Sequence, residues 1–125
     1  MNENYIENII YFPYKVDKFQ KDSINAIINN ENVLVTAHTS AGKSTIAEFA
    51  IALSSSKNKR SIYTSPIKAL SNQKYGDFQK KSGIKNSSIG ILTGDIKVNP
   101  DANVLVATTE IINNLLYTNI EYFDN

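Results

Sequence analysis

The chain has 125 residues, of which 42% are hydrophobic, so it holds enough apolar material for one small core. Its formal net charge of +1 gives no bulk attraction for nucleic acid, and the absence of cysteine excludes disulfide frameworks, thiolate metal sites and cysteine nucleophiles. The segment from Met1 to Ile10 lacks the features of a signal peptide, and no apolar run is long enough to span a bilayer. We therefore expect no membrane partner and an intracellular location, cytoplasmic or nuclear.

The first half of the chain predicts a helix, a strand, a loop and a second helix, in that order. A helix over residues 17–30 is indicated because Asp17 and Gln20 match a capping box and isoleucines follow at helical spacing. The β-branched run at residues 33–35 predicts a short, buried parallel strand. Small residues then fill a loop at residues 37–44, and the apolar residues after it recur with helical spacing.

The second half predicts the same alternation of strands and helices. Three short apolar runs predict strands, at residues 61–65, 88–92 and 103–107. Pro66 opens a helix that reaches roughly Lys80, and an apolar stripe from Ile111 marks the last helix. Such alternation implies parallel βαβ units and hence a three-layer αβα domain, an α/β fold with a parallel sheet. We expect this domain to cover residues 17–125, behind an N-terminal segment of residues 1–16.

The strongest chemical signal is the loop Ala37-His38-Thr39-Ser40-Ala41-Gly42-Lys43-Ser44, which is a P-loop pattern with alanine at the first glycine position. Small residues let backbone N–H groups wrap a phosphate, and the helix that follows points the positive end of its dipole at the same anion. Lys43 supplies a cation for the β and γ phosphates, and Ser44 offers a hydroxyl to Mg²⁺. A chance Gly-Lys-Ser tripeptide is the alternative, but the predicted strand before it and helix after it match the placement that phosphate binding requires.

Three other features have plainer interpretations than a binding site. His38 is the only histidine, and we interpret it as a loop residue because no partner ligands for a metal are visible. The basic stretch at residues 57–60 is interpreted as a solvated loop after a helix rather than a nucleic-acid patch. For four N-terminal aromatic residues, packing onto the domain is favoured over base stacking: Tyr5, Tyr11, Phe12 and Tyr14.

Residues 36–44 resemble the Walker A motif of the superkiller-type DExH-box RNA helicases, the branch that feeds RNA to the exosome, in which alanine at the first position is normal. Three more stretches resemble motifs of this family in matching order and spacing: residues 63–75 motif Ia, residues 92–95 with 99–102 motif Ib, and residues 107–111 motif Ic. The resemblance extends over nearly all of residues 12–117. It implies a RecA-like P-loop NTPase fold and an ATP-dependent RNA helicase with ATP and Mg²⁺ as cofactors.

The family's site residues are implied at matching positions. Lys43 is implied in catalysis and Ser44 in metal binding. Nucleotide binding is implied for Phe19 and Gln20 at the adenine, and for Ala37, His38, Thr39, Ser40, Ala41, Gly42, Lys43, Ser44 and Thr45 in the loop. Contact with a nucleic-acid backbone is implied for Pro66, Lys68, Ala69, Thr93, Gly94, Asp95, Thr108, Thr109 and Glu110. Each of these last motifs also has a structural explanation as a helix start, a turn or a cap, but together they fall at the carboxyl ends of predicted strands, where open α/β sheets bind ligands.

The 125 residues contain no Asp-Glu-x-His sequence, the acidic motif that this family uses for hydrolysis. We therefore expect a domain truncated before the DExH motif and inactive by itself, which in a longer protein binds RNA and partners of an RNA-decay complex. Two alternatives remain open. One is a truncated, non-catalytic module that binds nucleotide or RNA, and the other is a P-loop DNA helicase or translocase.

Overall fold

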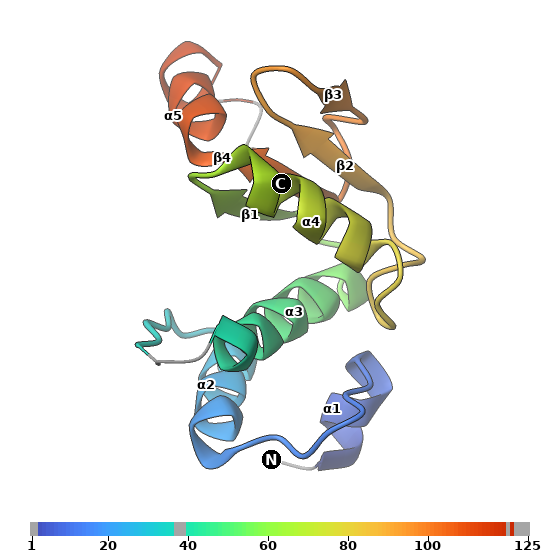
Figure 1. Cartoon of the computed structure of the whole chain (residues 1–125). Helices are drawn as coiled ribbons and strands as arrows, with labels where there is room; N and C mark the ends of the chain where they lie inside the picture. Colours follow the sequence, from blue (N-terminus) through green and yellow to red (C-terminus); the bar gives the residue numbers. More distant parts are fainter. Residues whose placement is uncertain (1–2, 37–39, 120, 122–125) are drawn as a thin grey trace.

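The computed structural model of the chain describes residues 3–36, 40–119 and 121, and in these residues helices cover both faces of a four-stranded sheet (Figure 1). The strands are β1 (Ser61–Ser65), β2 (Ile89–Leu92), β3 (Lys97–Val98) and β4 (Val104–Thr108). Their order is β1-β4-β2-β3. Because β1, β4 and β2 run parallel, their carboxyl ends lie at the same edge of the sheet.

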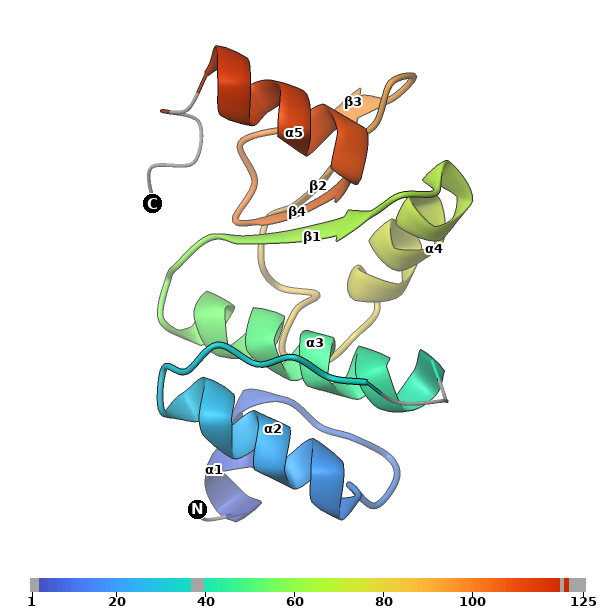
Figure 2. The same ribbon diagram turned by 90° about the vertical axis from the view of Figure 1, so that its left-hand side faces the viewer.

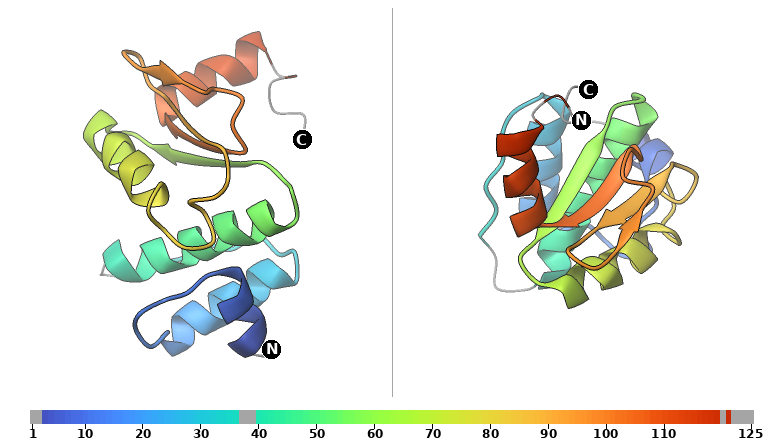
Figure 3. Two further views of the ribbon diagram at one scale, coloured as in Figure 1. Left: turned by 90° about the vertical axis from the view of Figure 1, so that its right-hand side faces the viewer. Right: turned by 90° about the horizontal axis from the view of Figure 1, so that it is seen from above.

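The helices form layers on either side of this sheet (Figure 2). They are α1 (Glu3–Ile9), α2 (Lys18–Ile28), α3 (Ser40–Ser56), α4 (Lys68–Phe78) and α5 (Thr109–Thr118). Helix α5 covers one face, whereas α3 and α4 lie on the other, with α1 and α2 packed beyond α3. The opposite side view in Figure 3 shows the same order of layers. The predicted α/β fold with an αβα arrangement is therefore confirmed.

The hydrophobic core lies between α3, α4 and the sheet. Phe49 of α3 and Phe78 of α4 are 0% and 1% exposed, and the ring of Phe78 meets Tyr63 of β1 edge to face at 5.5 Å between centroids. Every residue of β4 is buried, as expected for a central strand that is covered on both faces. Among the described residues, no helix combines the length and the apolar character that crossing a bilayer requires.

Two predicted elements differ from the structure around the phosphate loop. The predicted strand at residues 33–35 is wrong: residues 31–36 are not in a strand, and Leu34 is 91% exposed. A strand needs a hydrogen-bonded neighbour, and among the described residues none of the strand pairings of the sheet includes this segment. Helix α3 also begins at Ser40 rather than after Ser44, because Ser-Ala-Gly-Lys-Ser contains no proline and an existing helix extends cooperatively even through a glycine.

Two elements were not predicted at all. Helix α1 forms in the N-terminal segment, and β3 adds an antiparallel edge strand to the predicted parallel sheet. The turn before β3 is closed by the Thr93 N–H, which donates to the Ile96 carbonyl at 2.8 Å. The basic loop at residues 57–60 has a structural role, since the Arg60 guanidinium donates to the carbonyls of Pro100 at 2.7 Å and Ala102 at 3.1 Å.

Candidate nucleotide and nucleic-acid sites

The N-terminal end of α3 holds the described part of the predicted phosphate loop. Ala37, His38 and Thr39 lie outside the described residues, whereas Ser40 and Ala41 contribute backbone to the first turn of α3. The first turn of a helix leaves N–H groups without partners inside the helix, and it carries the positive end of the helix dipole. Lys43 is exposed in this turn. The N-terminal end of α3 therefore combines a helix terminus and a lysine side chain, both of which favour an anion.

Gln20 joins α2 to this end of α3. Its side chain is only 4% exposed, and its Oε1 accepts a hydrogen bond from the Asp17 N–H at 2.8 Å, as the predicted capping box requires. Its Nε2 donates to the Gly42 carbonyl at 3.2 Å. The sequence indicated the capping bond of this amide but not its second bond, which ties α2 to α3. The neighbouring Phe19 is 39% exposed, and the adenine contacts proposed for both residues stay predictions.

We expect Gln20→Leu to lower the free energy of unfolding by about 1–3 kcal/mol, because leucine keeps the volume but leaves the Asp17 N–H and the Gly42 carbonyl without this partner. Urea unfolding followed by circular dichroism measures the change. Gln79→Leu is the matched control, since Gln79 is exposed at the end of α4 and its replacement should change the midpoint little. Equal midpoints for both variants would contradict the role of Gln20.

Ser44 and Thr45 face different surroundings. Thr45 is 1% exposed, and its Oγ1 lies 2.5 Å from the Tyr14 hydroxyl, so this side chain is directed into the protein. Ser44 is partly exposed, and its Oγ accepts a hydrogen bond from Lys74 Nζ of α4 at 3.1 Å. Within the described residues there is no group of three or more histidine and acidic side chains that would hold a metal. The metal role of Ser44 therefore stays a prediction.

The predicted nucleic-acid residues come together at the carboxyl edge of the sheet. Ser65 at the end of β1 is in register with Thr108 at the end of β4, and Leu92 at the end of β2 is in register with Ala107. The segments that follow these strands therefore lie side by side. The ninth predicted residue, Thr108, is the last residue of β4, and these segments contain the other eight: Pro66, Lys68, Ala69, Thr93, Gly94, Asp95, Thr109 and Glu110. The structure thus brings motifs Ia, Ib and Ic to one edge.

Not all of these side chains are accessible. Thr93 and Thr108 are only 5% and 6% exposed, whereas the other seven residues are exposed. The Oγ1 of Thr93 accepts the N–H of Asp95 at 3.2 Å and that of Ile96 at 3.1 Å, so it shapes the turn after β2. Thr108 occupies the N-cap position of α5. These two buried threonines therefore have structural roles at the carboxyl edge of the sheet, in the turn after β2 and at the start of α5.

An ion pair crosses this edge and was not anticipated from the sequence. Lys68 Nζ donates to Asp95 Oδ2 at 2.7 Å, which links the start of α4 to the turn after β2. The hydrogen bond to Asp95 and its charge raise the pKa of the Lys68 ammonium, and the Glu110 carboxylate adds to this shift. No local pattern predicts such a pair, because the two residues are 27 positions apart.

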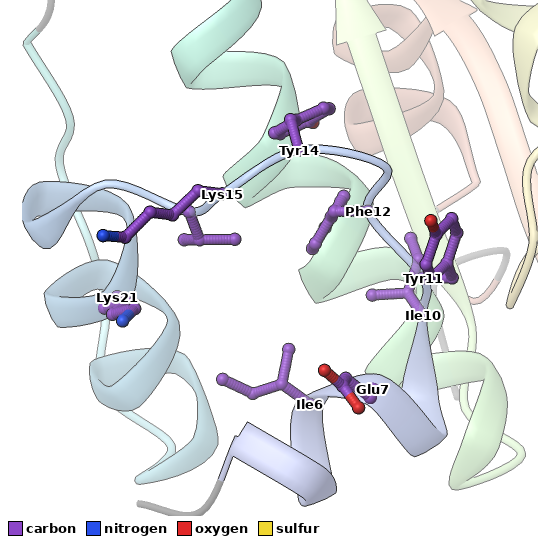
Figure 4. Close-up of a pocket in the computed structure, with 9 residues that line it drawn as sticks. Ile6, Glu7, Ile10, Tyr11, Phe12, Tyr14, Lys15 and Lys21 are labelled. Atoms are coloured by element: carbon purple, nitrogen blue, oxygen red, sulfur yellow. The ribbon is translucent and has the colours of Figure 1, made fainter.

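A cavity of about 260 Å³ lies between α1, α2 and the segment that joins them (Figure 4). Its lining is mainly apolar and aromatic, with charged side chains: Ile6, Glu7, Ile10, Tyr11, Phe12, Tyr14, Lys15, Val16 and Lys21. Phe12 packs against the core, and the centroids of its ring and the Tyr14 ring are 5.6 Å apart. Lys81 Nζ lies 5.0 Å from the centroid of the Phe12 ring. Packing is thus confirmed for Phe12, while Tyr5, Tyr11 and Tyr14 remain 39%, 63% and 48% exposed.

The family described as DEAD/DEAH box helicase matches residues 17–125 of the chain. The chain is 50% identical over 110 residues to the DExH-box ATP-dependent RNA helicase DExH9 of Arabidopsis thaliana, which covers 88% of this chain and 11% of that protein. It is 49% identical over 106 residues to the antiviral helicase SKI2 of Saccharomyces cerevisiae, 85% of this chain and 8% of that protein. It is 48% identical over 110 residues to the human exosome RNA helicase MTR4, 88% of this chain and 10% of that protein. The chain thus spans about a tenth of the length of these relatives.

Proposed function

The chain belongs to the DEAD/DEAH box helicase family, and from this premise we propose that it supplies the ATP-binding half of an ATP-dependent RNA helicase that acts in RNA processing or decay. The observation that carries this proposal is the identity of 48% to 50% over most of the chain to proteins named as helicases of this kind. We assign residues 17–125 to the helicase domain and residues 1–16 to an N-terminal segment, whose described part packs on that domain.

In this proposal the N-terminal end of α3 binds the phosphates of ATP. The first turn of a helix favours an anion through its N–H groups and its dipole, and the exposed Lys43 adds a cation at that place. Ser44 is proposed as the metal ligand because this residue is partly exposed and follows Lys43 directly. When bound, Mg²⁺ would neutralise charge on the β and γ phosphates. Phe19 and Gln20 are proposed to contact the adenine.

The carboxyl edge of the sheet is proposed to hold the RNA backbone. Its exposed groups include a lysine and backbone N–H groups at the starts of α4 and α5, which suit phosphate contacts that carry no sequence information. The ATP and RNA sites are connected through α4. Lys68 lies at the RNA edge of this helix, and Lys74 donates to Ser44 of α3.

Hydrolysis requires more than these residues provide. Attack of water on the γ phosphate needs acidic side chains that orient water and metal, and cations that stabilise the transition state. The 125 residues contain no Asp-Glu-x-His motif. We therefore propose that this chain binds ATP, and that turnover depends on residues outside it. The absence of this motif from the 125 residues also favours the alternative function, a non-catalytic module that binds nucleotide or RNA.

ATP binding and phosphate release, measured side by side on the same protein, test the proposal. We expect saturable binding of a fluorescent ATP analogue that depends on Mg²⁺, with no phosphate release above background. Single-stranded RNA should bind in preference to DNA of the same sequence if the chain acts on RNA like its named relatives. Absence of nucleotide binding would contradict the proposed function, and equal binding of DNA would favour a DNA helicase or translocase.

A further inference from the structure

The ion pair between Lys68 and Asp95 lies in the middle of the proposed RNA edge. Lys68 begins α4 after β1, and Asp95 follows β2, while β4 lies between these two strands in the sheet. The pair therefore bridges the end of the central strand. Both side chains are accessible, with 55% and 74% of their surfaces exposed. An incoming phosphate therefore meets this ammonium when it is already bound to a carboxylate.

The backbone that carries the carboxylate is held in place by its turn. The Thr93 hydroxyl oxygen accepts the N–H groups of Asp95 and Ile96, and the Thr93 N–H donates to the Ile96 carbonyl. Thr93 is itself buried, so the turn is anchored to the sheet. On the other side, a Cβ added at Gly94 would lie 3.7 Å from Lys68 Nζ, which places the ammonium close to the backbone of this turn. The pair is therefore supported by the fold on the Asp95 side.

Among the predicted nucleic-acid residues, acidic side chains outnumber basic ones. The predicted nucleic-acid residues include one cation, Lys68, and two exposed carboxylates, Asp95 and Glu110. An oxygen of Asp95 is 2.7 Å from Lys68 Nζ, at the distance that a phosphate oxygen would occupy. A phosphodiester oxygen and the Asp95 carboxylate therefore compete for the same ammonium.

We infer that Asp95 is an intramolecular counter-anion that competes with the RNA phosphate for Lys68 and so lowers the affinity of this edge. This inference rests on the proposed function. It gives Asp95 an unfavourable effect on RNA affinity, whereas the sequence predicted that Asp95 contributes to binding. Exposed ion pairs are weak, so a phosphate can displace the carboxylate, and the carboxylate can displace the phosphate in turn. Such exchange suits a protein that must release the backbone repeatedly.

The opposite role is also testable. If Asp95 accepted a hydrogen bond from a ribose hydroxyl, its replacement would weaken RNA binding, because the RNA would lose a charge-assisted contact. The two roles predict opposite signs for the same substitution.

The experiment compares Asp95→Asn with the unmodified protein in the binding of a fluorescent single-stranded oligouridylate at low ionic strength. Asparagine keeps the size of the side chain and removes its charge. Asp22→Asn is the matched control, since Asp22 forms an exposed ion pair with Lys18 on α2 at 2.9 Å and its replacement changes the net charge equally. A double-mutant cycle is completed by two further variants, Lys68→Gln and Lys68→Gln combined with Asp95→Asn.

We expect Asp95→Asn to tighten binding about three- to fivefold and Asp22→Asn to change it less than about twofold. Lys68→Gln should weaken binding, and in that background the gain from Asp95→Asn should fall below about twofold, because the shared ammonium is gone. Weaker or unchanged binding by Asp95→Asn would overturn the inference, as would an equal gain in both backgrounds. If the unmodified protein itself did not bind the oligouridylate, that result would instead count against the proposed function.

Discussion

Replacement of Lys43 by alanine is expected to weaken the binding of ATP about ten- to hundredfold, the loss that follows when a charged partner of a phosphate is removed. Lys43 is exposed in the first turn of α3, the turn in which a helix leaves its N–H groups without partners inside the helix. The ammonium and the helix end act on the same anion, so removal of the cation leaves only the backbone. Titration of a fluorescent ATP analogue with Mg²⁺ present measures the change.

Lys59→Ala is the matched control for this variant. Lys59 is an exposed lysine in the loop between α3 and β1, so its replacement removes the same charge at the opposite end of α3. We expect its ATP affinity to stay within about twofold of the unmodified protein, since exposed charges farther apart than a Debye length are screened. If Lys43→Ala and Lys59→Ala bound ATP with equal affinity, the proposed role of Lys43 in binding the phosphates would be contradicted.

Phe49→Ala is expected to lower the free energy of unfolding by about 3–5 kcal/mol. Phe49 is 0% exposed in the core cluster, where α3 packs against the sheet. Alanine loses the buried aromatic surface and leaves a cavity that surrounding side chains fill only in part. Because small domains are stable by only about 5–15 kcal/mol, this variant should be close to unfolding at room temperature. Urea unfolding followed by circular dichroism gives the difference.

Tyr117→Ala is the control for the loss of an aromatic side chain. Tyr117 is 85% exposed on α5, so its replacement should change the free energy of unfolding by no more than about 0.5 kcal/mol. A midpoint for Phe49→Ala that equals that of Tyr117→Ala would show that α3 does not form the core described here.

Local patterns in the sequence determined most of the secondary structure. The capping box of α2 depends on two residues three positions apart, and the hydrogen bond between Asp17 and Gln20 follows from it. The strands β1, β2 and β4 were predicted within one residue at either end, because short β-branched runs between turn residues leave few other choices. The order of the motifs along the chain likewise predicted that the segments after these strands would share one edge.

Tertiary structure decided what depends on a partner distant in the sequence. The apolar run at residues 33–35 has the composition of a buried strand, but without a paired neighbour two of its three residues, Val33 and Leu34, lie exposed. The bond from Gln20 to Gly42 and the ion pair from Lys68 to Asp95 join residues 22 and 27 positions apart. Whether Asp95 faces solvent, a phosphate or a lysine is set by the strand order, which places β1 and β2 on either side of β4. Local propensity contains no information about such neighbours, because they meet only when the sheet has formed.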